Sequence, residues 1–388
     1  MPLPAALLER IRSAPVPCLT VAEFMDWALY DPEYGYYSRA MEREQGPGID
    51  FLTSPHISRD FGALLAQQVA QCWQQLGCPD RWQVVEMGPG QGLLAADLLA
   101  ALQQNHPACL TATDYLLIER SGSLQRVQQR QLADWGDRCR WLTWAEFEQA
   151  GVEGVCFSNE LVDAFPVHRL QWQSGQWQEL YLEAKDDRLQ EQPGPLSDPQ
   201  LATVLADLGV NGATLPEGYR TEVNLTARDW LASVTRGLQR GYLLTIDYGY
   251  DAERYYSPSR SDGTLTAYRQ HRFGNDLWSH PGEQDLTAHV CFTTLEQWGQ
   301  ALGLETLGFT RQALWLMALG LGDRLAGISG SMVDAASLQA GLQRRDALQQ
   351  LIDPLGLGGF GVLIQGRGLT HAERQLPVLD LLATFPAA

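Results

Sequence analysis

The sequence has no long apolar run and no paired cysteine motif, and both absences narrow the class of protein. No stretch approaches the roughly 18 consecutive apolar residues of a membrane helix, and the first residues lack a basic segment followed by a long apolar one. We therefore expect neither a membrane span nor a secretory signal. The seven cysteines form no C-x-x-C pair and are odd in number, which favours reduced thiols in the cytoplasm and no metal site.

Basic residues are also scarce. The chain has 28 lysines and arginines against 46 aspartates and glutamates, for a net charge of -18. This balance makes nucleic acid and anionic membranes poor partners and suits a basic substrate or partner. At 388 residues, 45% of them hydrophobic, the chain is long enough for one large domain with insertions or for two domains. The composition leaves the oligomeric state unknown.

The segment from Val84 to Asp97 has the pattern of a buried strand, a glycine turn and an amphipathic helix. Gly88, Gly90 and Gly92 alternate across the turn, with Pro89 after the first of them. Glycine permits left-handed dihedrals and lets a ligand approach the bare backbone. Because the start of a helix also presents free N–H groups, the turn predicts a nucleotide-type ligand, although glycine turns without ligands are common.

Glu86, two residues before the first glycine, distinguishes two classes of such ligand. Dinucleotide sites of the G-x-G-x-x-G type favour an apolar residue there, because a carboxylate would repel the pyrophosphate. A carboxylate suits a cationic ligand, and S-adenosylmethionine carries a sulfonium and an ammonium but no phosphate. We therefore predict S-adenosylmethionine as the cofactor and keep a dinucleotide oxidoreductase as an alternative.

A second acidic residue, Glu119, ends the apolar run that starts at Tyr115. An acid at this place holds the ribose hydroxyls of a bound nucleoside. The number of residues between the glycines and Glu119 exceeds the roughly 20 residues of a minimal unit. We therefore expect residues 105–113 to form an extra loop that makes up the difference. The alternative for Glu119 is a solvated strand end.

A further apolar strand ends in a polar segment that carries Asn159, Glu160 and Asp163. Ligands of open α/β sheets lie beyond the carboxyl ends of the strands, so these side chains should share an edge of the sheet with the glycine turn. An ordinary loop in which Asn159 and Asp163 cap helices is the alternative.

The remaining segments predict additions to this α/β pattern. The tyrosine-rich segment 30–37 packs in the core or forms the wall of a ligand pocket. Ser54 or Ser58 caps a helix or contacts a ligand, and His56 is expected to be a solvated loop residue. Residues 171–185 predict a hairpin, and 185–199 a charged connector. We divide the chain into an N-terminal helical cap with an aromatic loop (1–80), a core (81–170 and 221–388), an inserted hairpin and helix (171–220) and a lid loop within the core (251–290).

Seven motifs give the chain a resemblance that covers nearly its whole length. They are A-L-Y-D-P-E-Y-G-Y-Y (28–37), F-L-T-S-P-H-I-S (51–58), E-M-G-P-G-Q-G (86–92), S-N-E-L-V-D-A-F-P-V-H (158–168), D-Y-G (247–249), D-L-T-A-H-V (285–290) and F-G-V-L-I-Q (360–365). In this order they resemble the MidA-like methyltransferases, which include a mitochondrial complex I assembly factor that methylates an arginine. The family commonly has arginine in place of Gln91 and an acid in place of His289.

The resemblance implies an α/β fold of the class I, Rossmann-like methyltransferase type, with a seven-stranded sheet, a reversed last strand, N-terminal helices and inserted substrate-side elements. It implies S-adenosylmethionine-dependent methylation of an arginine in a protein such as a complex I-type NADH dehydrogenase subunit. The alternative is a cofactor-binding assembly factor with little activity. Methyl transfer requires alignment of donor and acceptor, and an arginine also requires carboxylates that orient it and accept a proton.

These considerations give two sets of site residues. We expect the cofactor to contact Glu86, Gly88, Pro89, Gly90, Gly92, Glu119, Ser158 and Asn159. We expect the acceptor to meet Glu160 and Asp163, with Asn159 or Tyr36 adding hydrogen bonds; Asp247 and Glu222 are weaker candidates.

Overall fold

The computed structural model describes residues 3–14, 16–39, 53–186, 188–269, 272–274, 276–329 and 335–382. Several of the sequence predictions extend outside these ranges. The residues concerned are the first two of the 51–58 motif, parts of the 1–80 cap, residue 187 of the expected connector and insertion, residues 270, 271 and 275 of the expected lid, and residues 330–334 and 383–388 of the expected core.

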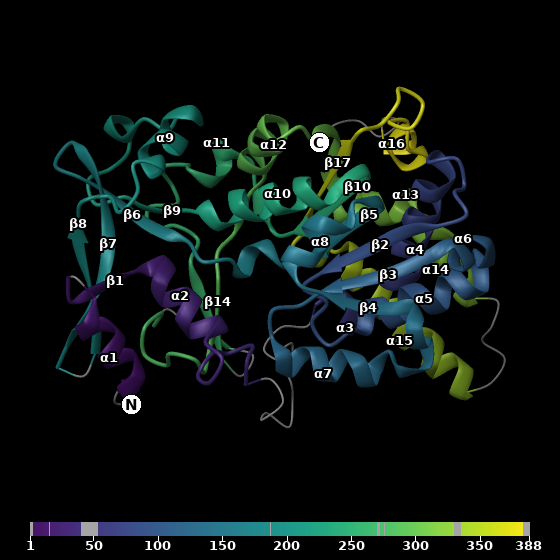
Figure 1. Ribbon diagram of the computed structural model, residues 1–388, viewed down its shortest axis with the longest axis horizontal. Coiled ribbons are helices and arrows are strands. Elements are labelled where there is room, and N and C mark those ends of the chain that lie inside the picture. Colours follow the sequence, from purple (N-terminus) through teal and green to yellow (C-terminus); the bar gives the residue numbers. More distant parts are fainter. Residues whose placement is uncertain are drawn as a thin grey trace.

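A seven-stranded sheet forms the core (Figure 1). In spatial order its strands are β16 (Glu305–Arg311), β17 (Gly361–Arg367), β10 (Leu238–Asp247), β5 (Val152–Asn159), β2 (Trp82–Met87), β3 (Thr113–Ile118) and β4 (Cys139–Leu142). Strands β10, β5, β2, β3 and β4 pair in parallel, whereas β17 runs antiparallel to both of its neighbours. This reversed strand confirms the class I methyltransferase fold expected from the resemblance.

Helices cover both faces of this sheet because its central strands are apolar on both sides. In β2, Val84 packs into one core cluster, whereas Val85 and Met87 pack into another on the opposite face. The first cluster takes in α4 (Arg59–Gln75), α5 (Leu93–Asn105), α6 (Pro107–Ala112), α13 (Gln312–Ala318), α14 (Leu321–Ser329), α15 (Ala335–Ile352) and α16 (Pro377–Leu382). The second takes in α8 (Trp144–Ala150), α10 (Leu225–Gly237) and α12 (Phe292–Ala301).

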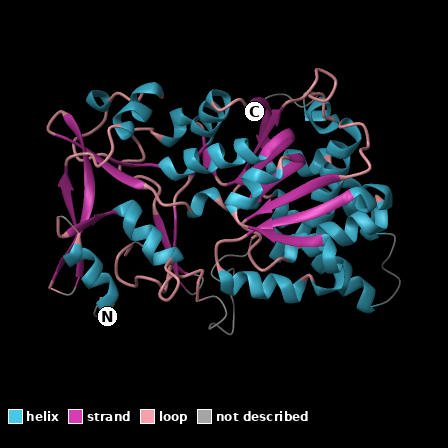
Figure 2. Cartoon of the chain, viewed as in Figure 1, coloured by secondary structure: helices cyan, strands magenta, loops and turns pink. Residues whose placement is uncertain are grey.

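A second, antiparallel sheet lies at the far end of the molecule (Figure 2). It contains β1 (Cys18–Thr20), β7 (Gln176–Lys185), β6 (His168–Gln173), β9 (Arg220–Val223) and β8 (Arg188–Gly194). The β6–β7 hairpin agrees with the sequence. The expected connector over 185–199 is wrong, because it contains β8, whose seven residues pair with β7. The inserted segment also extends beyond 171–220 at both ends and takes in β1 from the N-terminal segment.

The N-terminal helices pack against the small sheet (Figure 1). Helix α1 (Ala5–Ser13) lies against β1 and β7, and α2 (Val21–Tyr30) contacts both the small sheet and β14 (Asp285–Thr287). Thr20 caps α2 in a capping box with Glu23. The side chain of Ser58 caps α4, which confirms the capping alternative for that residue.

Two expected loops contain regular structure. Residues 105–113 hold helix α6 and not an irregular loop. The expected lid over 251–290 includes α11 (Ala252–Tyr255) and a three-stranded sheet of β12 (Thr266–Arg269), β13 (Arg272–Gly274) and β14. Hydrogen bonds between neighbouring strands hold these elements together, whereas sequence patterns detect such short strands poorly.

The parallel register brings the carboxyl ends of three strands to one edge. Glu86 lies opposite Phe157 and Leu117, and Met87 opposite Ser158 and Ile118. The glycine turn, Glu119 and the segment after β5 therefore meet at the same edge of the sheet.

Candidate active site

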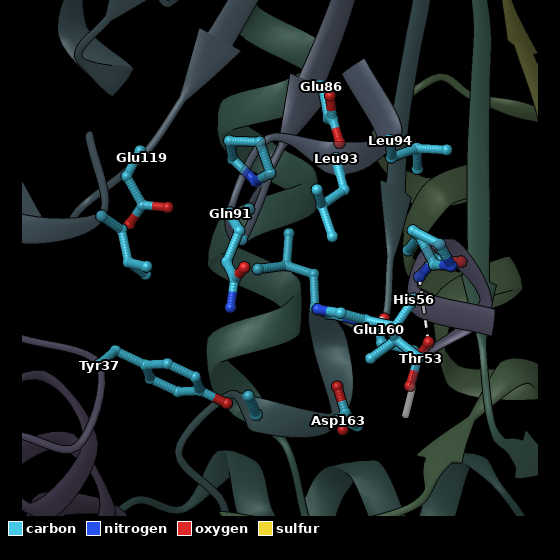
Figure 3. Close-up of a pocket in the computed structure, with 18 of the residues that line it drawn as sticks. Tyr37, Thr53, His56, Glu86, Gln91, Leu93, Leu94, Glu119, Glu160 and Asp163 are labelled. Carbon is cyan, nitrogen blue, oxygen red and sulfur yellow. Dashed lines mark hydrogen bonds between the residues drawn. The ribbon is translucent and has the colours of Figure 1, made fainter. Parts of the chain in front are cut away.

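A cavity of about 170 Å³ lies at this edge (Figure 3). Its walls come from the ends of β2, β3 and β5, from α2 with the residues after it, and from the segment at α3 (Ser54–Ile57). Among the described lining residues, five carry carboxyl groups and none is a lysine or arginine; the acids are Glu86, Glu119, Glu160, Asp163 and Asp285. Such a cavity favours cationic ligands.

The glycine turn forms one wall of the cavity. Gly88, Gly90 and Gly92 have φ values of 68°, 54° and 80°, in the left-handed region that glycine adopts without strain. A Cβ at Gly88 would lie 2.6 Å from Leu161, whereas a Cβ at Gly90 would meet nothing within 4 Å. Gly88, Pro89 and Gly90 line the cavity. Gly92 does not line it: this residue is the N-cap of α5, and a Cβ added there would lie 3.5 Å from Gln128.

Glu86 occupies the buried end of β2. Its side chain is 3% exposed and accepts a hydrogen bond of 2.6 Å from the Tyr115 hydroxyl. Burial raises the pKa of Glu86 to about 7, so a cation beside it would recover the cost of ionising it.

Glu119 is held at the end of β3 by two hydrogen bonds. It accepts from the Ser121 amide at 2.7 Å and from Nε2 of Gln128 at 3.0 Å. The same Nε2 donates to the Gly90 carbonyl at 2.8 Å, and Trp141 donates to the Gln128 carbonyl oxygen. Burial raises the pKa of Glu119 to about 7. Gln128 therefore links the glycine turn to Glu119, a role that its place in a glutamine-rich helix did not indicate.

The segment after β5 brings two carboxyl groups into the cavity. Glu160 has a left-handed φ of 52°, and its side chain accepts a 3.1 Å hydrogen bond from the Asn159 amide. Burial, with a smaller effect from Asp163, raises the pKa of Glu160 to about 8. Asp163 accepts a 2.6 Å bond from Tyr248, and burial raises its pKa to about 6. Asn159, Glu160 and Asp163 all line the cavity.

Three other residues that we expected at the site, Ser158, Asp247 and Glu222, are not among the described residues that line the cavity. Ser158 is buried in β5, and its hydroxyl meets no hydrogen-bond partner among the described residues. Asp247 accepts from the amides of Val162 and Asp163 and so shapes the segment that carries Asp163. Glu222 accepts from Thr264 in a different region.

The aromatic segment contributes through two other tyrosines. Tyr36 packs in the core beside α2, whereas Tyr30 and Tyr37 line the cavity and stack with 5.5 Å between ring centroids. Figure 3 shows Glu86 and Glu119 in the upper part of the cavity and Glu160 and Asp163 in the lower part, with Tyr37 below Glu119.

Three further lining residues were not expected to contribute. Gln91 and Asp285 lie in recognised motifs without an assigned role, and His56 was expected to be a solvated loop residue. Nδ1 of His56 lies 2.6 Å from the hydroxyl oxygen of Thr53, within hydrogen-bond distance. Nε2 of His56 is buried and has no hydrogen-bond partner among the described residues. Burial lowers the pKa of His56, so the ring is neutral near pH 7. His289, by contrast, packs against Tyr248 and Tyr250 outside this cavity.

A second cavity, of about 720 Å³, adjoins the first. The two share Tyr30, Gly88, Glu119 and Leu161 as lining residues. Beyond these residues, the larger cavity has aromatic walls formed by Trp144, Phe165 and Trp230. A ligand extended past Glu119 can therefore reach both cavities.

Among the described residues, no group of three or more histidine, cysteine, aspartate or glutamate side chains is arranged to hold a metal ion. Nor does any helix in the described ranges combine the length and apolar character needed to cross a membrane.

The sheet order, the glycine turn and the acids that end β2 and β3 together define a class I methyltransferase that uses S-adenosylmethionine. Residues 64–310 match a family model described as "Putative S-adenosyl-L-methionine-dependent methyltransferase". The chain belongs to this family, the MidA-like methyltransferases.

Solved structures and curated proteins support this assignment. A crystal structure from Burkholderia thailandensis, bound to S-adenosyl-homocysteine, is 31% identical with a TM-score of 0.83 and covers 97% of this chain and 93% of its own. The human mitochondrial protein arginine methyltransferase NDUFAF7 is 27% identical over 95% of this chain and 86% of its own length. The rat NDUFAF7 is 29% identical over 88% and 79%. S-adenosylmethionine is therefore the cofactor.

Proposed function

We propose that the acceptor of the methyl group is an arginine side chain of a partner protein. The observation that carries this proposal is the excess of carboxyl groups in the cavity. A donor that uses Glu86 and Glu119 leaves Glu160, Asp163 and Asp285 for a second cation, and no lysine or arginine among the described lining residues neutralises them. The names of the curated relatives support arginine as that cation.

We assign the donor to the boundary between the two cavities. Glu119 binds the ribose hydroxyls, and Glu86 binds the amino group. Because Glu119 lines both cavities, the smaller cavity would hold the methionine part, and the aromatic walls of the larger one would hold the adenine. Gly88, Pro89 and Gly90 provide the close backbone approach. The bound cofactor supplies an activated methyl group on a sulfonium.

We assign the acceptor to Glu160 and Asp163. A guanidinium has several N–H donors and a pKa above about 12, so it enters as a cation. Its charge favours ionisation of the two carboxyl groups, which then orient the attacking nitrogen through charge-assisted hydrogen bonds. One of these carboxylates would accept the proton that the nitrogen loses when it takes up the methyl group. Asn159 holds Glu160 in position.

We further propose a subunit of a complex I-type NADH dehydrogenase as the partner protein. The MidA-like resemblance and the similarity to NDUFAF7 support this choice. The net charge of -18 is compatible with a basic segment on the partner. A cytoplasmic location remains a prediction from the cysteine content.

The test is transfer of a radiolabelled methyl group from S-adenosylmethionine to proteins captured from a cell extract, with mass spectrometry of the labelled residue. We expect methylarginine in one or a few proteins. Methyl groups on another residue type would overturn the arginine assignment. Tight donor binding without any transfer would favour the alternative of a cofactor-binding assembly factor.

A further inference from the structure

Tyr37 and Asp285 meet in the active-site cavity although 248 residues separate them in the chain. The Tyr37 hydroxyl donates to both carboxylate oxygens of Asp285, at 2.9 and 3.1 Å. Both residues line the cavity, and each comes from outside the central sheet. Tyr37 follows α2, and Asp285 begins β14.

Tyr37 is fixed to the part of the site that holds the donor. Its carbonyl oxygen accepts hydrogen bonds from the hydroxyls of Ser121 and Ser123, at 3.0 and 3.3 Å. The Ser121 amide in turn donates to Glu119, the residue assigned to the ribose. The position of the Tyr37 ring is therefore set relative to the donor.

Asp285 is fixed to the part of the site that holds the acceptor. Directly after β14, the Ala288 amide donates to the carbonyl oxygen of Asp163 at 2.9 Å. Asp285 is 8% exposed, and its negative charge contributes to the raised pKa of Glu160. Glu160 and Asp163, on the segment after β5, and Asp285, on β14, thus line the same space.

This space is built for a ligand with hydrogen-bond donors. Oδ1 of Asp163 is buried, in a side chain that is 6% exposed, and has no partner among the described residues although the side chain lines the cavity. An unpaired buried acceptor is costly, which points to a donor group supplied from outside. A guanidinium offers five N–H donors in one plane. Two carboxylates on one segment cannot satisfy all five of these donors.

We propose that Asp285, held by the Tyr37 hydroxyl, is the third carboxylate of the acceptor subsite and binds the guanidinium together with Glu160 and Asp163. This inference rests on the proposed arginine methyltransferase function. It gives the additions outside the central sheet a direct part in recognition: the segment after α2 supplies Tyr37, and β14 supplies Asp285. The sulfonium donor does not require this carboxylate, because Glu86 and Glu119 are assigned to it.

The test compares Asp285→Asn with Asp276→Asn, an exposed acid of the same segment that does not line the cavity. Affinity for S-adenosyl-homocysteine is measured by calorimetry, and methylarginine formation is measured over a dilution series of cell extract. We expect unchanged donor affinity in both variants. Asp285→Asn should need about tenfold more extract for half-maximal transfer, the effect of losing one hydrogen bond to a charged group. Tyr37→Phe should shift the curve in the same direction by less.

The outcomes separate this inference from the proposed function. If Asp285→Asn forms methylarginine and needs the same amount of extract for half-maximal transfer as the wild-type enzyme, the role of Asp285 is overturned and the proposed function stays intact. Loss of S-adenosyl-homocysteine affinity in Asp285→Asn would also overturn it, because Asp285 would then belong to the donor site. A wild-type enzyme that forms no methylarginine would overturn the proposed function and this inference together.

Discussion

The proposed function assigns single side chains of the cavity to a donor part and an acceptor part. Glu119 is assigned to the donor part: two hydrogen bonds hold its carboxylate, and one of them comes from Gln128, which also binds the glycine turn. Glu160 and Asp163 are assigned to the acceptor part, and each is buried with a raised pKa. These two groups of residues predict opposite effects of substitution on donor binding and on methyl transfer.

We expect Glu119→Ala to weaken binding of S-adenosylmethionine by about 1.5–3 kcal/mol, because a charged acceptor of the ribose hydroxyls is lost. Calorimetry measures the effect. Glu119→Gln keeps the size of the side chain and its contact with Gln128, so it should lose less binding free energy. A change of a few tenths of a kcal/mol in the alanine variant would return Glu119 to the alternative of a solvated strand end.

We expect Glu160→Gln and Asp163→Asn each to retain affinity for S-adenosylmethionine but to lower methyl transfer by ~10²-fold or more, the scale of a positioned acid or base. The amides keep the shape and remove the charge. Glu153→Gln is a suitable control, because Glu153 is an exposed acid of β5, the strand that precedes both residues. If both active-site variants lose donor binding instead, the segment after β5 belongs to the donor site.

At the scale of elements, the proposed donor site depends on the strand–turn–helix unit around β2 and α5. Gly90 and Gly77 form a matched pair: both have left-handed φ values, of 54° and 85°, both are exposed, and an added Cβ at either would meet nothing within 4 Å. A valine in this backbone region is strained at either position. Only Gly90 lines the cavity.

We therefore expect Gly90→Val and Gly77→Val to lower the thermal stability to a similar, small extent, whereas only Gly90→Val abolishes donor binding. Thermal melting and calorimetry with S-adenosyl-homocysteine measure the two effects. Equal donor affinity in both variants would remove the glycine turn from the donor site. A large loss of stability specific to Gly90→Val would instead show that this position matters for folding.

The small sheet shows where local patterns are insufficient. Its central hairpin was predictable because Ser174 and Gly175 lie between two alternating segments. Strand β1 was not, since it is only three residues long and pairs with β7 at residues 181–183, far along the chain. Short strands at sequence-distant positions carry no periodic signal of their own.

At the scale of the whole molecule, buried acids make stability depend on pH. The folded-state pKa of Glu160 is about 8 against an ordinary value of 4.5, so the folded protein binds more protons than the unfolded chain between these values. The free energy of unfolding therefore falls as the pH rises through this range. Glu86 and Glu119, with folded-state pKa values of about 7, act in the same direction.

We expect Glu160→Gln to melt at a higher temperature than the wild-type protein at pH 8, and the difference to shrink towards pH 5, where Glu160 is protonated in the folded state. The measurement is thermal melting of the donor-free protein at both values. The exposed variant Glu153→Gln should show no such trend. A difference of the same size at pH 5 and pH 8 would contradict the buried, protonated state of Glu160.

The sequence alone determined the central part of this molecule. Parallel strands, each followed by a helix, place the ends of β2, β3 and β5 at one edge, so that Gly88, Glu119 and Glu160 could be grouped from local patterns. Each of these residues ends or directly follows a strand whose apolar run is visible in the sequence. The chemistry of the donor followed from the acid that precedes the glycines.

Only the tertiary structure decided which other residues complete the site. Gln128 reaches Gly90 across 38 residues, and Tyr37 reaches Asp285 across 248. Asp247, Glu222 and Ser158 have the expected residue types, yet neighbouring segments enclose them away from the described lining of the cavity. Such contacts depend on how separate segments pack, and no periodicity along the chain encodes them.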